Sequence, residues 1–303
     1  MYCRNNWLTY SFGGLPQRRS HEDLELIFNE TTNNLLPLDI VSHQTAKEIH
    51  ALYPNVYVAM SGGCDSEYVA KSFKAAGVPF TAIMMTCKGY FSIGEWYVDK
   101  WCHENAVTLI KFEVDPHKLL AYGQKTLFKI RGINWFGVTV NLLANEVERL
   151  GGYMVTGALP SYYPDPKLEL VKVDAEFKRT FRGFVFDESD FYIELVNPDK
   201  HPWAFFYWSP EMLASIIYHW DTTQPVENNK WRMFDLLPRP KLNGTEVFTR
   251  NFLANTIPEY TAMFLWLSAN KKLRWGTRDF YPCPDQTEFL KLLINNYLVD
   301  NNY

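Results

Sequence analysis

A six-residue segment, Ser61 to Ser66 with the sequence SGGCDS, contains the residue types that bind phosphate. Two adjacent glycines let the backbone turn tightly, so that successive N–H groups can point into one concavity and bind anionic oxygens. Ser61 and Ser66 add hydroxyl donors, and a helix that starts here adds unpaired N–H groups and the positive end of its dipole. Asp65 is a carboxylate in the same place. It is compatible with phosphate where Mg²⁺ accompanies the phosphate or where the side chain caps the helix.

The spacing of this segment excludes two common phosphate-binding motifs. It lacks the GxxxxGK[ST] pattern, and no lysine stands where it would reach a γ-phosphate. It also lacks the GxGxxG spacing of a dinucleotide-binding turn. What distinguishes the segment is its placement, directly after an expected strand at 55–60 and before an expected helix at 67–76.

In that position SGGxDS resembles the PP-loop of the N-type ATP pyrophosphatases, the adenine nucleotide alpha hydrolase-like superfamily, over roughly residues 55–159. Asparagine synthetase, 7-cyano-7-deazaguanine synthase and phosphoadenylylsulfate reductase are members. In this family the loop holds the β- and γ-phosphates of ATP while a nucleophile attacks the α-phosphate and pyrophosphate leaves. The resemblance therefore implies ATP and Mg²⁺ as cofactors, and a doubly wound, mainly parallel, Rossmann-like α/β sheet.

The resemblance also implies roles for individual residues. Asp65 would be catalytic and would hold Mg²⁺, while Arg131 would contact the α-phosphate. Lys88, just beyond the second strand, is a further candidate catalytic residue that would contact phosphate or substrate, because it lies at the sheet edge where α/β proteins bind ligands. The alternative for Arg131 and Lys88 is an ordinary solvated charge. The full set expected to contact ATP is Ala59, Met60, Ser61, Gly62, Gly63, Cys64, Asp65, Ser66, Met85 and Gly157.

The expected reaction is adenylation. A substrate oxygen attacks the α-phosphate to give an acyl- or imidoyl-adenylate, and an amine or ammonia then displaces AMP, as in a ligase or amidotransferase. The alternatives are a tRNA- or DNA-base-modifying enzyme, a phosphoadenylylsulfate-reductase-like protein and a non-catalytic ATP-binding module. The basic stretch Lys271–Arg278 favours nucleic acid, whereas the net charge of −4 and the pI of about 6.0 oppose it. Cys283 lacks the residues that surround the reductase cysteine.

The elements expected around the motif alternate between strand and helix. Short apolar, β-rich runs separated by helix-length segments predict a parallel sheet covered on both faces. Glu95, Asp99 and Glu104 on one of these helices form either a solvated face or a carboxylate group near the phosphates. The expected strands are 55–60, 80–86, 108–114 and 153–156, and the expected helices are 67–76, 94–105 and 136–150.

Outside this region the patterns are weaker, and we expect three parts: a lead-in at 1–54, the ATP-binding domain at 55–160 and a mostly helical, aromatic-rich extension at 161–303. The extension would serve substrate binding or oligomerisation, and its aromatic run His201–Trp208 is either core or a stacking wall for substrate. The further expected elements are a capped helix from Ser20 through Phe28, a helix at 45–53, a loop at 160–166, strands at 168–173 and 184–186, and helices at 209–220 and 248–267.

The composition is that of an ordinary globular protein, with 47% hydrophobic and 21% charged residues among 303. Five dispersed cysteines without a CxxC pair argue against a disulfide framework or a four-cysteine zinc site. No apolar run reaches the roughly 18 residues of a membrane helix. We therefore expect a cytoplasmic protein (in the host cytoplasm if the chain is viral) that acts on a small molecule, with homo-oligomers possible.

Overall fold

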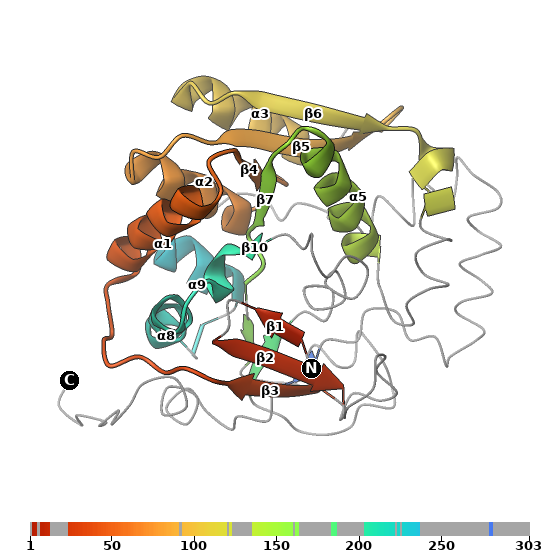
Figure 1. Ribbon diagram of the computed structural model, residues 1–303. Helices are drawn as coiled ribbons and strands as arrows, with labels where there is room; N and C mark the ends of the chain where they lie inside the picture. Colours follow the sequence, from red (N-terminus) through yellow and green to blue (C-terminus); the bar gives the residue numbers. More distant parts are fainter. Residues whose placement is uncertain are drawn as a thin grey trace.

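The centre of the molecule is a five-stranded sheet in which all neighbouring strands are parallel, as the computed structural model in Figure 1 shows. The parallel α/β sheet expected from the sequence is therefore confirmed. The structure describes residues 2–4, 7–12, 24–90, 93–119, 121–122, 135–159, 161–163, 183–186, 203–221, 223–224, 226–236 and 279–280. The sheet order is β10 (Trp203–Ala204), β7 (Tyr153–Thr156), β4 (Val56–Ala59), β5 (Thr81–Cys87) and β6 (Leu109–Val114).

Both faces of the inner strands β7, β4 and β5 are covered, which explains why these strands are mostly apolar. Val58 of β4 belongs to the larger apolar cluster, to which helices α2 (Cys64–Ala75) and α3 (Ile93–Asn105) contribute. The next residue, Ala59, packs against a smaller cluster to which helix α5 (Trp135–Arg149) contributes. Because successive side chains of a strand point to opposite faces, α2 and α3 cover one face and α5 covers the other.

The order of the strands reverses its direction between β4 and β7, which is the topological switch point of the sheet. The chain adds β5 and β6 on one side of β4, and then crosses over to add β7 and β10 on the other side. This is the doubly wound arrangement predicted from the sequence. The carboxyl ends of β4 and β7 adjoin at the switch point, which is where open α/β sheets bind their ligands. The fifth strand, β10, comes from beyond residue 160, so the sheet itself includes part of the extension.

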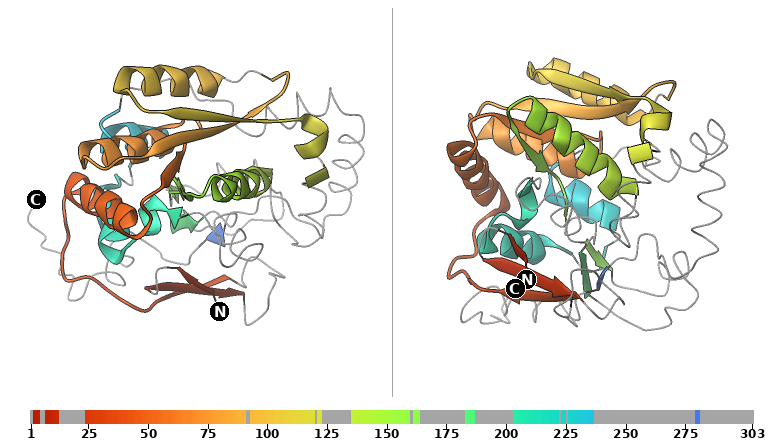
Figure 2. Two further views of the ribbon diagram at one scale, coloured as in Figure 1. Left: turned by 45° about the horizontal axis from the view of Figure 1, so that its top comes forward. Right: turned by 45° about the vertical axis from the view of Figure 1, so that its right-hand side comes forward.

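The N-terminal segment forms a separate antiparallel sheet, and this corrects the helix expected from Ser20 through Phe28. Residues Leu24–Phe28 are strand β3, which pairs with β2 (Leu8–Phe12), and β2 pairs with β1 (Tyr2–Arg4). The alternation of LELIF fits a strand once a partner strand is present, so a non-local pairing overrides the local helix-start signal. Figure 2 shows from two further directions that this sheet lies apart from the central one.

Helix α1 (Leu38–Leu52) is longer than the helix expected at 45–53. It begins directly after Pro37, whose restricted φ and missing N–H suit a helix start, and it ends before Pro54. Its buried stripe packs against α2 and α8 (Pro210–His219). The buried residues are Leu38, Val41, Ser42, Thr45, Ala46 and Ile49.

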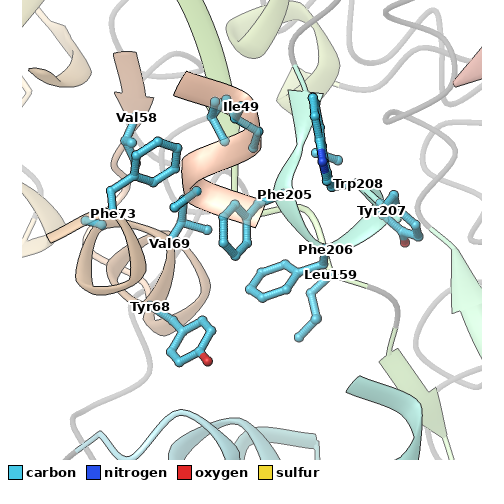
Figure 3. Packing of buried hydrophobic residues seen from close by; sticks show 14 of the residues in the cluster. Ile49, Val58, Tyr68, Val69, Phe73, Leu159, Phe205, Phe206, Tyr207 and Trp208 are labelled. Carbon is cyan, nitrogen blue, oxygen red and sulfur yellow. The ribbon is translucent and has the colours of Figure 1, made fainter. Parts of the chain in front are cut away.

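The aromatic run 201–208 is core, not an open stacking wall, over its described residues. Phe205 and Phe206 are fully buried in the 3-10 turn η1 (Phe205–Tyr207), and Figure 3 shows them in one cluster with Val69 and Phe73 of α2. Trp7 is also buried, and its indole N–H donates to the carbonyls of Tyr207 (3.2 Å) and Trp208 (3.1 Å). This turn therefore joins α2 to the N-terminal sheet.

The rest of the described extension mixes helix and strand. Helix α8 matches the one expected at 209–220, and the Ser209 hydroxyl caps it by accepting from the Met212 N–H (3.2 Å). Strand β9 (Gly183–Phe186) matches an expected strand, but it pairs with β8 (Ser161–Tyr163), which lies where a loop was expected, and with β11 (Asp279–Phe280). Helix α9 (Val226–Met233) was not anticipated. The elements expected at 168–173 and 248–267 fall outside the described residues. None of the described helices is long and apolar enough to cross a membrane.

Two buried thiols lead to a prediction about the stability of the fold at alkaline pH. Burial, with smaller contributions from nearby acidic residues, raises the pKa of both the Cys87 and the Cys102 thiols from 9.0 to about 11. Above pH 9 the unfolded chain releases these protons while the folded chain keeps them. The free energy of unfolding should therefore fall between pH 9 and pH 11. Urea unfolding of Cys102→Ala across this range should show a shallower fall than the wild type, and equal slopes would contradict the assignment.

Candidate functional site

The SGGCDS segment lies at the switch point of the sheet. It starts one residue after Met60, whose N–H donates to the carbonyl of Ile83 (2.9 Å) and so extends the pairing between β4 and β5. Ser61–Gly63 then form the turn, and α2 begins at Cys64. The segment therefore sits at the carboxyl end of β4, where the sequence predicted it.

Two backbone contacts fix the path of this turn. Gly62 has a φ of +80°, and a Cβ atom added there would lie 2.5 Å from the carbonyl oxygen of Gly94 and 2.6 Å from its Cα. A Cβ at Gly157, just after β7, would lie 2.8 Å from the Asp65 carbonyl carbon and 2.8 Å from the Ser66 nitrogen. The structure thus packs the turn between the first turn of α3 and the end of β7, and only glycine leaves room for both contacts.

The two serine hydroxyls hold the turn in shape. Ser66 Oγ donates to the carbonyl of Gly63 (3.1 Å) and accepts from the N–H of Ser61 (3.2 Å). Ser61 Oγ lies 3.2 Å from Ser66 Oγ and accepts from the N–H of Gly63 (3.3 Å). Ser66 is buried and Ser61 is exposed. Ser66 therefore shapes the turn from within, whereas Ser61 stands where it can meet a ligand.

The N-terminus of α2 has the character of an anion site. The N-cap residue is Gly63, which has no side chain to satisfy the first-turn N–H groups. Such groups, with the positive end of the helix dipole, attract anionic oxygens. Asp65 does not cap the helix through its own side chain, so capping, one of the two expected explanations for a carboxylate here, does not apply.

Asp65 instead forms an ion pair with a lysine that the sequence analysis did not identify. Lys230 Nζ of α9 lies 2.6 Å from Asp65 Oδ2, and both side chains are partly buried, with exposed fractions of 14% for the lysine and 26% for the aspartate. The thiol of Cys64 lies 3.4 Å from Asp65 Oδ1. No local pattern marks Lys230, because 165 residues separate it from Asp65.

A stack of aromatic rings sets the position of α9 on α2. The ring of Tyr68, one turn after Asp65, stacks on that of Phe234 with centroids 4.3 Å apart. Phe234 follows Lys230 by one helical turn and also stacks on Phe206, at 5.5 Å. Lys71 Nζ adds a polar contact by donating to the carbonyls of Asp235 (3.1 Å) and Phe234 (3.5 Å). Apolar packing therefore determines which residue of α9 meets Asp65.

The other predicted site residues have mixed outcomes. Lys88 follows β5 at the same sheet edge, and its side chain is exposed. Met85 is half-buried on β5 and packs against both apolar clusters. Arg131 falls outside the described residues. Ala59 is the last residue of β4, and Met60 follows it directly before the turn. Met60 is buried, so contact with a ligand there would come from the backbone.

The carboxylates of α3 have a structural role. Lys111 Nζ of β6 lies 2.8 Å from Glu95 Oε1 and 2.7 Å from Asp99 Oδ2. The hydrogen bonds that Lys111 donates to Asp99 and then to Glu95 raise its pKa. These carboxylates tie α3 to the edge of the sheet, which fits the solvated-face interpretation.

The described residues limit how a metal ion could be held. Among them, no group of three or more His, Cys, Asp or Glu side chains lies together. A metal ion at Asp65 would therefore have at most two such ligands among the described residues. That fits Mg²⁺, which takes most of its ligands from water and substrate phosphates, and it does not fit an ion held in a protein cage.

A cavity of about 490 Å³ lies between α1, α2, α8 and the end of α9. The described part of its lining includes Tyr68, Lys71, His219 and Arg232, and no residue of the SGGCDS turn. Burial, and then the charge of Arg232, lowers the pKa of His219. The cavity is thus separate from the turn, although α2 and α9 border both.

Comparisons with known proteins give partial likenesses in structure. No family model and no curated protein matches the sequence. NMN synthetase from Francisella tularensis is similar at 12% identity and a TM-score of 0.31, over 40% of this chain and 54% of that one. NH3-dependent NAD synthetase from Campylobacter jejuni is similar at 16% identity and a TM-score of 0.32, over 40% of this chain and 56% of that one. The chain thus spans about half the length of each.

The close approach at Gly62 predicts a stability difference between two glycines. Gly62→Ala brings both a disfavoured positive φ and a clash with the backbone of Gly94, so it should lower the free energy of unfolding by roughly 3 kcal/mol or more. Gly77 is the matched control, because its φ is +70° and nothing lies within 4 Å of an added Cβ. Gly77→Ala should cost only about 1 kcal/mol in urea unfolding. Equal losses would show that the Gly62 contact is not tight.

Proposed function

We propose that this chain is an ATP-dependent adenylating enzyme of the PP-loop type, which cleaves ATP to AMP and pyrophosphate. The observation that carries the proposal is the place of SGGCDS: a glycine turn at the switch point of a doubly wound sheet, opening directly into an uncapped helix N-terminus. A triphosphate is a ligand that this combination of N–H donors and dipole favours. The exposed Ser61 hydroxyl adds a further donor.

The roles proposed for the described residues rest on their positions, and the role proposed for Arg131 rests on the sequence resemblance alone. The N–H groups at the start of α2 and the Ser61 hydroxyl bind the β- and γ-phosphates, and Gly157 lets the backbone of the β7 end approach the nucleotide. Arg131 and Lys88 are proposed contacts to the α-phosphate and to phosphate or substrate. Mg²⁺ bound through Asp65 would neutralise charge on the departing pyrophosphate. Positioning and fixed charge are the main contributions of the protein in such a reaction.

The proposed chemistry has two balanced steps. A carboxylate or carbonyl oxygen of the substrate forms a bond to the α-phosphorus as the bond to the bridging oxygen breaks, which gives an adenylate and pyrophosphate. An amine or ammonia then attacks the activated carbon, and AMP leaves with the electron pair of the C–O bond. The nitrogen loses a proton, and the product is an amide or amidine. The acceptor is proposed to be a small molecule, with a nucleobase or nucleotide precursor as one class.

The direct test follows the α-phosphate. ATP labelled at the α-phosphate, with Mg²⁺ and a pooled small-metabolite extract, should yield labelled AMP and an equal amount of pyrophosphate. ADP as the product would overturn the proposed cleavage. Tight binding of ATP with no turnover would favour a non-catalytic module or a macromolecular acceptor such as tRNA.

A pair of matched variants tests the assignment of the site. Asp65→Asn should reduce AMP formation by at least about 100-fold, the range seen when a charge-stabilising group is removed from an active site. Asp99→Asn is the control, since that carboxylate is on α3 and bonded to Lys111. Asp99→Asn should leave the rate of AMP formation within about twofold of the wild type, because it removes no charge from the proposed active site. Equal rates in the two variants would place the active site elsewhere.

A further inference from the structure

We propose that Lys230 is a built-in counter-ion of the turn, which allows ATP to bind there without a metal ion. The proposal rests on the proposed function, because it concerns the same phosphate site. It assigns to α9 a role in nucleotide binding that the SGGCDS motif does not contain. In this arrangement the metal ion is needed for turnover, while Lys230 supports binding itself.

The reason lies in the charge of Asp65. Its carboxylate is in the first turn of α2, in the region where the phosphates of ATP are proposed to bind. Two anionic groups in one partly buried place repel each other, and the repulsion is strong because water screens it poorly there. A metal ion bound by both groups would remove the repulsion. Lys230 Nζ, 2.6 Å from Asp65 Oδ2, already supplies a positive charge at that place.

Lys230 is held in position before any ligand arrives. Only 14% of its side chain is exposed, and the Tyr68–Phe234 stack fixes the helix that carries it. A cation whose place is set by packing does not lose further side-chain freedom when the ligand binds. The positive charge of Lys230 therefore offsets the negative charge of Asp65 while ATP binds, and no later conformational change is needed.

The chain supplies its own matched control in Lys71. Lys71 also joins α2 to the end of α9, but its ammonium group donates to the backbone carbonyls of Phe234 and Asp235 and not to Asp65. Lys71→Gln therefore loosens the same helix contact and removes one positive charge, while the Asp65–Lys230 pair stays intact. A purely structural role for Lys230 would make Lys230→Gln and Lys71→Gln behave alike.

The experiment measures the affinity of α,β-methylene ATP by equilibrium dialysis, once in EDTA and once in Mg²⁺. The wild type should bind it in EDTA within about tenfold of the affinity in Mg²⁺. Lys230→Gln should lose a further tenfold or more in EDTA, and less than about threefold in Mg²⁺. Lys71→Gln should follow the wild type in both. Adding Asp65→Asn to Lys230→Gln should restore binding in EDTA, because the uncompensated carboxylate is then gone.

Three outcomes would overturn the inference. Wild-type binding that disappears in EDTA would show that a metal ion is required even with Lys230 in place. Equal losses in Lys230→Gln and Lys71→Gln, or no rescue by Asp65→Asn, would reduce Lys230 to a structural contact. If the nucleotide fails to bind the wild type in either condition, the proposed function itself falls, and the inference falls with it.

Discussion

The N-terminus of α2 holds a carboxylate, Asp65, at a place that favours anions, and the surrounding structure depends on how this negative charge is balanced. Asp65 is well placed for the dipole of α2, which favours negative charge in the first helical turn. The same property makes the place attractive to a phosphate group. Lys230 of α9 balances this carboxylate from another part of the chain. The ion pair persists only while α9 keeps its position on α2.

Aromatic packing fixes the position of α9 on α2. The stacked rings of Tyr68, Phe206 and Phe234 join α2, the buried 3-10 turn and the end of α9, one helical turn away from each partner of the ion pair. On the other side, the contact between Gly62 and Gly94 sets the turn against α3. The site is therefore built on rigid elements whose apolar contacts decide where its polar atoms lie, as precise binding sites require.

The sequence predicts the central unit well because its signals are local. Strand β4, the SGGCDS turn and α2 follow one another within residues 56–75, and each shows its own period or turn chemistry. The missed features depend on distant partners. Residues Leu24–Phe28 become a strand only beside β2, and Trp203–Ala204 become one only beside β7. Lys230 is one of 30 lysines and arginines, and nothing near it in the sequence sets it apart.

The hydrogen bonds of Trp7 link residues that the ribosome adds to the chain at widely separated times. The indole N–H needs carbonyls that come 200 and 201 residues later in the chain. At the usual 5–20 residues per second, that interval is roughly 10 to 40 s of synthesis. The sheet of β1, β2 and β3 is therefore made before this partner, which follows only after the strands of the central sheet up to β7. The earlier segment thus completes its docking only after residues 207 and 208 have been added, so folding on the ribosome departs here from a simple N-to-C order.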